Sequence, residues 1–380
     1  MTRPLRVLVL NERDPTHPRA GGAEVHVAEI AQRLHAMGFS ITQYACSHRG
    51  APATEAVAGM TVRRLGPLPV YYPRVVVETA RETRRGRFDV VVEYLNKLPF
   101  CARTYAAAPV LAVNHHLFGE SAFVQAPWPI AAAVVALEGL IPRVYRDVPF
   151  LAISESSRQD LVARGIPAEH IGLSCPGADL PAVEPTPMAE RPCRIVYLGR
   201  LEKYKRVDLL LSACASLAPR FPALEIAIIG RGAERERLEA LARDLGLAGR
   251  TRFAGFVPPA ERDRLVAGAR IAVFPSVKEG WGLAAIECNA LGVPVVATDA
   301  PGLRDSVRPD QTGVLVPDAG PEAFATALAQ ALASLLGDEA RLTRLAAGAR
   351  AWARRFDWDT AAAEMAQALR ALAEAPEESR

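Results

Sequence analysis

The sequence predicts an α/β protein with two doubly wound, mostly parallel sheets. Its 380 residues exceed the size of one typical domain and suit two. Short apolar runs alternate with helical patterns, which is typical of β-α-β units and parallel sheets. A proline-rich stretch at 176–192 interrupts this alternation, so we expect one domain on each side of it.

The first half opens with a buried strand at Leu5–Leu10, a turn-rich loop at 11–22, and a helical pattern that ends at Gly38. Further strands are predicted at 39–46, 61–65, 88–93, 109–114 and 150–154. We therefore assign residues 1–180 to an N-terminal Rossmann-like domain, followed by a linker at 181–192.

A second series of strands and helices begins at Arg194–Leu198. Strands are predicted at 194–198, 224–229, 251–256, 271–275, 293–298 and 313–316, with helices at 206–218, 233–245, 260–268, 283–291, 321–336, 339–355 and 358–374. Residues 193–356 are expected to form a second Rossmann-like domain. Residues 357–380 are expected to form a helix that packs back towards the N-terminal domain.

Composition narrows the class of protein. The net charge is only +3, from 45 basic and 42 acidic residues, which argues against a nucleic-acid partner. The six cysteines form no Cys-x-x-Cys pair, so we expect free thiols in a reducing compartment. The N-terminus lacks the pattern of a signal peptide, and the longest apolar stretch, 130–141, is too short to span a bilayer. These observations favour a cytoplasmic protein, either a monomer or a homodimer.

An arginine-rich segment with two tyrosines runs from Arg63 to Arg87. A solvated helix and loop is the favoured interpretation, and peripheral contact at the inner face of a membrane is the alternative. The apolar region 118–149 either lines an acceptor pocket or packs as core.

The strongest candidate site is the stretch Lys278–Glu287. Glu279 follows a predicted strand, and Glu287 falls about one turn into the next helix. Gly280-Trp281-Gly282-Leu283 lies between the two carboxylates. Ligands of open α/β sheets bind beyond the carboxyl ends of the strands, where glycines let the backbone approach an anion closely. The pattern indicates hydroxyl recognition beside a phosphate.

Two other loops in this half carry matching features. Gly199-Arg200-Leu201 follows a strand, and Lys205 stands where the next helix begins. These cations suit the binding of a diphosphate. The alternative is that both are solvent-exposed surface side chains without a ligand. Gly230 and Gly232 close the next strand, but they lack the third glycine of the dinucleotide fingerprint.

The first half offers Gly21 and Gly22 before a helix, as a second clamp on a phosphate, and His115 at the end of a strand. The adjacent His115 and His116 are poorly arranged as joint metal ligands, so no metal site is predicted. Asp357 and Asp359 flank a helix start and are interpreted as a cap and a first-turn acid.

Together these motifs resemble glycosyltransferase family 4, a retaining family with the GT-B architecture of two Rossmann-like domains that face a central cleft. Glu279–Glu287 is similar to the family's Glu-x7-Glu signature, and Gly199–Lys205 to its Gly-Arg-Leu-x3-Lys signature. Gly21–Glu24, Pro176–Asp179, Gly255–Val257 and Gly292–Val296 also match, in the same order along the chain.

The resemblance implies a role for each matched residue. Glu279 would contact the donor sugar, and Glu287 the nucleotide ribose. Arg200 and Lys205 would neutralise the diphosphate, with the N–H of Gly22 assisting from the other domain. Gly255, Phe256 and Val257 would lie against the nucleobase, and His115 near the donor sugar and the acceptor. The remaining donor-binding candidates are Gly21, Gly230, Gly232, Gly280, Trp281, Gly282 and Leu283.

The implied activity is transfer of a hexose from a UDP- or GDP-linked sugar to a hydroxyl acceptor, by a same-face mechanism that needs no metal and no cofactor besides the donor. The acceptor is a glycan, a lipid-linked molecule or a small metabolite. A sugar-nucleotide epimerase of the same fold and a non-catalytic sugar-nucleotide-binding protein are the alternatives. The first would need no acceptor. The second is disfavoured because Arg200, Lys205, Glu279 and Glu287 are all present.

Overall fold

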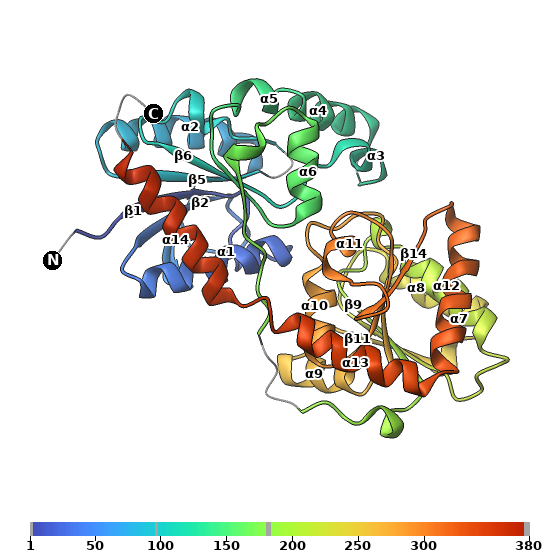
Figure 1. Cartoon of the computed structure of the whole chain (residues 1–380). Helices are drawn as coiled ribbons and strands as arrows, with labels where there is room; N and C mark the ends of the chain where they lie inside the picture. The colour runs from blue at the N-terminus through green and yellow to red at the C-terminus, as the bar shows by residue number, and fades with distance from the viewer. Residues whose placement is uncertain (1–2, 96–97, 126, 180–183, 376–380) are drawn as a thin grey trace. The chain divides into compact units, whose positions relative to one another are not determined.

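The computed structural model describes residues 3–95, 98–125, 127–179 and 184–375. Backbone contacts divide the chain into two compact units (Figure 1). Unit 1 contains Met1–Gly177 and Trp358–Arg380, and unit 2 contains Ala178–Asp357. Residues 181–183 of the predicted linker and the last residues, 376–380, lie outside the described residues.

Unit 1 contains an eight-stranded sheet in the order β3-β4-β2-β1-β5-β6-β7-β8. Neighbouring strands are parallel, except that β3 runs antiparallel to β4. The strands are β1 (Arg6–Leu10), β2 (Ser40–Ala45), β3 (Thr54–Val57), β4 (Met60–Arg64), β5 (Val90–Leu95), β6 (Val110–Asn114), β7 (Phe150–Ala152) and β8 (Ile171–Leu173).

Strands β3 and β8, at the two edges of this sheet, were not predicted from the sequence. Residues of β3 are exposed or half-buried, and two of the three residues of β8 are exposed. Edge strands need no continuous apolar run, because one flank and much of each face meet solvent. The missing apolar signal therefore explains why both strands escaped prediction.

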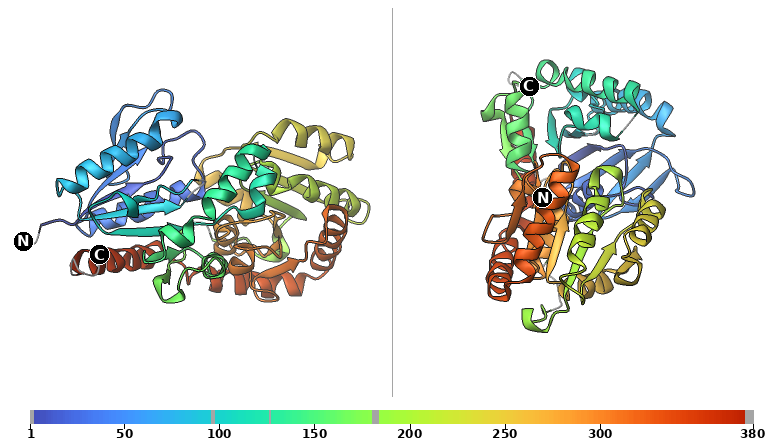
Figure 2. Two further views of the ribbon diagram at one scale, coloured as in Figure 1. Left: turned by 90° about the horizontal axis from the view of Figure 1, so that it is seen from above. Right: turned by 90° about the vertical axis from the view of Figure 1, so that its right-hand side faces the viewer.

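Helices cover both faces of the unit 1 sheet. They are α1 (Gly22–Ala36), α2 (Leu68–Arg84), α3 (Ala122–Gln125), α4 (Trp128–Glu138), α5 (Ile141–Val144), α6 (Glu155–Ala163) and α14 (Trp358–Glu374). One core joins Leu8, Leu10 and Val91 of the sheet to Tyr71 of α2 and Ile141 of α5. On the other face α1 and α14 pack against each other, and α14 also contacts β5 and β6 (Figures 1 and 2).

Helix α14 belongs to unit 1 although it follows unit 2 in the chain. Trp358, Met365 and Leu369 are buried along its length. Near its start, Asp359 accepts a hydrogen bond of 2.6 Å from Nε of Arg33 on α1. Asp359 thus has a structural partner within the unit.

Unit 2 contains a six-stranded parallel sheet in the order β11-β10-β9-β12-β13-β14. The strands are β9 (Arg194–Leu198), β10 (Glu225–Ile229), β11 (Thr251–Gly255), β12 (Ile271–Phe274), β13 (Val295–Thr298) and β14 (Gly313–Val316). The helices are α7 (Val207–Leu217), α8 (Arg235–Asp244), α9 (Pro259–Ala267), α10 (Leu283–Ala290), α11 (Leu303–Ser306), α12 (Pro321–Leu336) and α13 (Glu339–Ala353).

Successive residues of β9 point to opposite faces of this sheet, as strand geometry requires. Ile195 and Tyr197 join a core that includes α7, α8, α12 and α13. Val196 joins a second core with α9, α10 and α11. Both faces are covered, and the central strands β9, β12 and β13 are largely apolar and buried, so the α/β prediction with parallel sheets is confirmed.

The described part of the predicted linker packs into unit 2. Met188 is buried in the core that contains Ile195. The buried Arg191 donates hydrogen bonds to the carbonyl oxygens of Ala269, at 2.8 Å, and Gly292, at 3.0 Å. Residues 184–192 are therefore part of unit 2 and anchored to it by Met188 and Arg191.

Candidate functional site

The unit 2 sheet changes its direction of winding between β9 and β12. Strands β10 and β11 follow β9 on one side, and β13 and β14 follow β12 on the other. The loops after two such strands diverge and leave a crevice at their carboxyl ends, where ligands of open α/β sheets bind. The loop after β9 carries Arg200 and Lys205, and the loop after β12 carries Glu279.

Lys205 and Glu279 meet at this point. Nζ of Lys205 lies 2.5 Å from Oε1 of Glu279, and the two side chains are 14% and 16% exposed. Lys205 also lies over the ring of Tyr204, whose hydroxyl accepts a hydrogen bond from Arg200 at 3.0 Å. The topology thus brings Glu279 to the loop that carries Arg200, Tyr204 and Lys205, although Glu279 lies 74 residues beyond Lys205 in the sequence.

Arg206 holds the loop after β9 in place. It has a positive φ of 51°, and its guanidinium donates hydrogen bonds to the carbonyl oxygen of Pro275 and to Thr298. It also forms an ion pair of 2.7 Å with Asp318. These contacts tie the ends of β9, β12, β13 and β14 together, so Arg206 fixes the geometry in which Lys205 reaches Glu279.

Glu287 lies on α10 at the predicted distance from Glu279, about one turn into the helix. Its Oε1 is 3.3 Å from the guanidinium of Arg262 on α9. Burial raises the pKa of the Glu287 carboxyl, whereas the charge of Arg262 opposes that rise. The carboxylate is therefore held near a cation in an environment that favours hydrogen bonding to a hydroxyl group.

Gly230 and Gly232 lie where the loop after β10 contacts the backbone of the loop after β9, which leaves no room for a side chain. A Cβ on Gly230 would lie 1.9 Å from the carbonyl oxygen of Gly199, and one on Gly232 would lie 2.0 Å from that of Leu201. The backbone of Leu201 also donates a hydrogen bond to Arg231 at 2.8 Å. These glycines thus place the loop that carries Arg200, and their expected contact with a donor stays a prediction.

Two aromatic residues of the predicted donor site differ in exposure. Phe256, after Gly255 at the end of β11, is 72% exposed and lies under the guanidinium of Arg231 at 4.6 Å. Trp281 is 4% exposed and packs edge-on against Phe356. Phe256 is therefore available to a ligand, whereas the side chain of Trp281 supports the loop from within. The expected contact of Trp281 with a donor stays a prediction.

Residue 282 must be glycine for two reasons, its backbone conformation and the lack of space for a side chain. Its φ is +82°, and a Cβ there would lie 2.5 Å from Oγ of Ser306. It precedes Leu283, the first residue of α10. Gly282 therefore lets the loop between Glu279 and Glu287 turn tightly into the helix.

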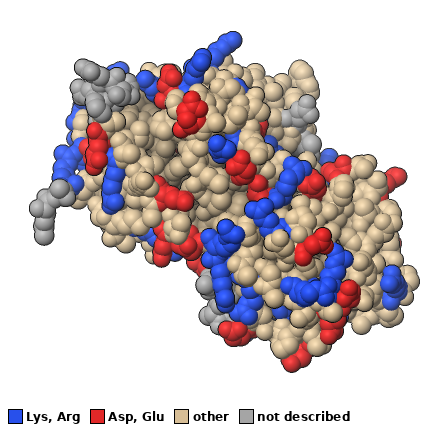
Figure 3. Space-filling model, viewed as in Figure 1, with Lys and Arg blue, Asp and Glu red and all other residues tan. Residues whose placement is uncertain are grey.

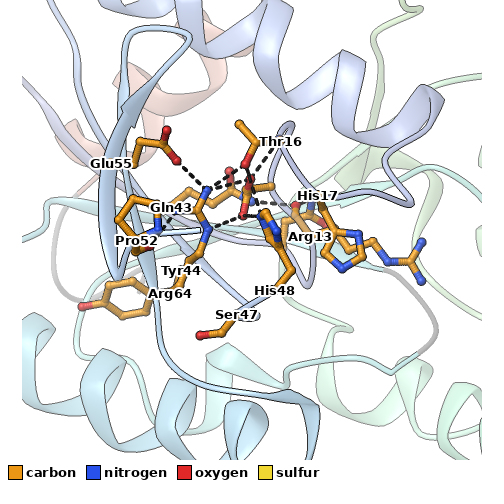
Figure 4. Close-up of polar contacts among 12 residues, drawn as sticks. Arg13, Thr16, His17, Gln43, Tyr44, Ser47, His48, Pro52, Glu55 and Arg64 are labelled. Carbon is orange, nitrogen blue, oxygen red and sulfur yellow. Dashed lines mark hydrogen bonds and ion pairs between the residues drawn. The ribbon is translucent and has the colours of Figure 1, made fainter. Parts of the chain in front are cut away.

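In unit 1 the loop before Gly21 is anchored by a buried ion pair (Figure 4). Asp14 accepts hydrogen bonds of 2.9 and 3.1 Å from Arg64, and both side chains are 0% exposed. Thr16 donates to the same carboxylate, and Arg64 also reaches Glu55. Burial alone would raise the pKa of Asp14, but the hydrogen bonds from Arg64 and Thr16 hold it below its ordinary value.

The N–H of Gly21 already has a partner. It donates a hydrogen bond of 2.6 Å to Oε2 of Glu24, three residues into the helix start. Gly22 is exposed, and no atom lies within 4 Å of the position of a Cβ. Of the two glycines, Gly22 is thus better placed to approach a ligand.

His115 lies at the end of β6, as expected, but its side chain is buried. Its Nε2 is 2.8 Å from Nδ1 of His26 on α1, and the two residues are 6% and 2% exposed. Burial lowers the pKa of His115 to about 3, and burial with the nearby His115 lowers that of His26. Both rings are therefore neutral at pH 7. The adjacent His116 is half-buried and packs on Phe118.

Within the described residues, no cluster of three or more His, Cys, Asp or Glu side chains is placed to hold a metal ion. Acidic and basic side chains are interspersed over the face seen in Figure 3. This distribution agrees with the small net charge.

Models of two protein-family domains match the chain in succession. Residues 20–181 match glycosyltransferase family 4, and residues 183–352 match the glycosyl transferases of group 1. The D-inositol 3-phosphate glycosyltransferase of Rhodococcus opacus is 30% identical to the chain, over 97% of the chain and 91% of that protein. The chain belongs to glycosyltransferase family 4.

Solved structures show that this glycosyltransferase has the GT-B fold, as predicted. The sucrose-phosphate synthase of Thermosynechococcus elongatus matches 97% of the chain and 99% of its own with a TM-score of 0.81 and 23% identity. HepE of Anabaena, solved in complex with UDP-glucose, matches 97% of the chain and 100% of its own with a TM-score of 0.76 and 19% identity. In the described part of the glycosyltransferase, no helix has the length and apolar character needed to cross a bilayer.

The structure of this glycosyltransferase adds residues that sequence reasoning missed, namely Arg206, Arg262 and His26. Arg206 follows Lys203 and Lys205 in one cationic run, and nothing in that run indicates which side chain turns inward. A signal for His26 exists, since it falls on the apolar face of α1 with Val27 and Ile30. A polar residue on such a face needs a partner, and the partner is supplied by the fold.

Proposed function

We propose that the protein transfers a hexose from a UDP- or GDP-linked sugar to a hydroxyl group of its acceptor, with retention of anomeric configuration and without a metal ion. The observation that carries the proposal is the pairing of Lys205 with Glu279 beyond the carboxyl ends of β9 and β12. A cation and a carboxylate at this crevice suit the diphosphate and the sugar hydroxyl groups of one donor.

The chemistry of glycosyl transfer fits these groups. Positive charge develops on the sugar and negative charge on the leaving diphosphate, and fixed cations act most strongly where charge grows. Arg200 and Lys205 would supply those cations. Glu279 and Glu287 each pair with a cation, which suits hydroxyl recognition better than covalent attack on the sugar. The leaving phosphate would then help to deprotonate the acceptor on the same face.

Relatives suggest which substrates to try first. HepE was solved with UDP-glucose, and the Rhodococcus relative is a D-inositol 3-phosphate glycosyltransferase. UDP-glucose is therefore the first donor to test, and an inositol phosphate is the first acceptor. Exposed Phe256 supports a donor whose base stacks on an aromatic ring.

Two surfaces of unit 1 support an acceptor presented at the cytoplasmic face of a membrane. On α2, Leu68 and Val77 are exposed beside Arg74 and Arg84. On α4, Trp128 is 71% exposed. Apolar side chains beside arginines suit an anionic lipid surface. Co-sedimentation with vesicles that contain phosphatidylglycerol, compared with vesicles of phosphatidylcholine alone, tests this contact. If the protein pellets with neither kind of vesicle, the contact is excluded.

The decisive experiment incubates the purified protein with UDP-glucose, UDP-galactose, UDP-N-acetylglucosamine or GDP-mannose and a panel of hydroxyl acceptors. Mass spectrometry identifies a glycosylated product, and NMR of its anomeric proton reports retention. Replacing Glu279 with Ala should abolish transfer and leave the fold intact, and full turnover by this variant would refute the assignment. Activity that persists in EDTA is expected for a reaction that needs no metal.

The same experiment separates the alternatives. A new nucleotide sugar formed without acceptor would indicate an epimerase. Thermal stabilisation by a nucleotide sugar without any turnover would indicate a binding protein.

A further inference from the structure

The pair formed by His26 and His115 is not accounted for by the roles described above. Its hydrogen bond joins α1 to the end of β6, two elements that are separated in the sequence. His26 lies one helical turn after Gly22, so it faces the same side of α1 as that residue. The bond thus links the helix start expected to meet the diphosphate to the strand end expected to lie near the sugar.

We propose that His26 is a positioning residue, which acts through His115 to hold the start of α1 and the end of β6 in the register that substrate binding needs. This inference rests on the proposed glycosyl transfer. It assigns to His26 a role that no motif in the sequence carries.

The packing around the pair fixes the two rings. Tyr94 of β5 lies with its ring centroid 5.3 Å from that of His115 and 6.0 Å from that of His26. Trp358, the first residue of α14, stacks on His26 at 5.9 Å. Enclosed in this way, neither imidazole can turn to a different partner without displacing a large aromatic ring.

The proton inventory makes the two rings interdependent. Because both are neutral, each carries one N–H, and a single proton occupies the bond between them. If Nδ1 of His26 donates, Nε2 of His26 is bare and Nδ1 of His115 is protonated. If Nε2 of His115 donates, both outer nitrogens have the opposite state. Changing one ring therefore changes the hydrogen-bonding character of the other.

Stability alone gives no reason to keep this arrangement. Within the described residues, Nε2 of His26 and Nδ1 of His115 are buried without a hydrogen-bond partner. Each such group costs free energy, whereas two apolar residues of similar shape are often neutral or stabilising. A costly buried polar pair beneath two site elements is typical of residues kept for function.

The test compares His26→Asn, His26→Leu and Val27→Ala. The Asn side chain can replace the hydrogen bond made by Nδ1, and Leu cannot. Val27 is buried on the same helix, so its truncation disturbs packing without touching the pair. We expect kcat to fall about tenfold or more in His26→Leu, because small misplacements of site groups are costly. His26→Asn and Val27→Ala should stay within about threefold of wild type.

Each result decides the inference. It is overturned if His26→Leu, folded by circular dichroism, keeps wild-type kcat, or if His26→Asn is no more active than His26→Leu. An equal loss in Val27→Ala would show that general packing explains the effect.

A second measurement needs no substrate. Long-range ¹H–¹⁵N NMR of ¹⁵N-histidine protein should show one bonded pair of imidazoles in the same tautomer, both Nδ1–H or both Nε2–H, and His26→Leu should alter the signals of His115. Two different tautomers, or no bonded pair, would overturn the inference whatever the activity. If wild-type protein transfers no sugar while these signals are present, the proposed function fails and the pair stands.

Discussion

Replacing Lys205 with Met removes the ammonium group and keeps most of the aliphatic stem. In the native protein this group lies 2.5 Å from Glu279, and the two side chains are 14% and 16% exposed. The pair is thus less exposed than a surface ion pair, for which about 0–1 kcal/mol is usual, and less sealed than a fully buried one. We expect Lys205→Met to lower the free energy of unfolding by about 1.5–3 kcal/mol, the range for a hydrogen bond to a charged group.

A double-mutant cycle separates stability from activity. Glu279→Gln, added to Lys205→Met, removes the carboxylate that the first change left without its cation. The double variant should therefore recover part of the lost stability, because contacting residues are not additive. Activity should not recover, since loss of one group that stabilises developing charge costs about 10²–10³ in kcat.

Thermal unfolding without ligand measures the first effect, and release of the nucleoside diphosphate measures the second. For a domain of this size, a change of 1.5–3 kcal/mol corresponds to about 3–12 °C in Tm. If the double variant is no more stable than Lys205→Met, the two side chains do not stabilise each other as the structure indicates. If Lys205→Met turns over normally, Lys205 does not neutralise the leaving group.

Two further predictions concern the loops. Arg64→Met leaves the buried carboxylate of Asp14 without its partner and should destabilise unit 1 by about 3–5 kcal/mol at pH 7, measured by urea unfolding. The folded pKa of Asp14 lies below its ordinary value of 3.8, so the stability that Asp14 contributes is present above that pH and is lost as the pH falls through the folded pKa. The difference in unfolding free energy between wild type and Arg64→Met should therefore narrow in acid, and a constant difference would contradict this origin. Gly282→Ala forces a side chain into a positive φ and against Ser306, and should cost at least about 1–2 kcal/mol and impair donor binding. Gly22→Ala, where no atom lies within 4 Å of the new Cβ, is the matched control for stability and should leave Tm unchanged within error.

The sequence was sufficient for most of the fold because the central strands of unit 2 are buried on both faces. Such strands are continuous apolar runs, and Ile271–Phe274 was found within one residue of its observed end. Edge strands such as Thr54–Val57 have no apolar run and were missed. Hydrophobic periodicity in a sequence reports burial, so it gives no signal where a strand is exposed to solvent.

For the site, the sequence predicted which residues take part but not how they contact one another. The sequence placed Glu279 and Lys205 each just after a predicted strand, where ligands of parallel sheets bind. The structure adds that β9 and β12 are neighbours in the sheet, so the two loops meet. Their ion pair could not be predicted, because it depends on how Arg206 ties the loops together. The burial of His115 depends on His26, a residue on another element, and pairing across elements leaves no trace in a local pattern.

The position of α14 has a consequence for how the chain folds during synthesis. Residues 358–374 complete unit 1, yet they leave the ribosome only after all of unit 2. Until then the sheet face that α14 covers is open to solvent, and unit 2 is the first unit whose residues are all available. A nascent chain of this enzyme therefore carries an unfinished N-terminal unit throughout translation of its second one, which is the period when chaperones would bind it. Unlike most two-domain proteins, it cannot complete its domains in the order in which they begin.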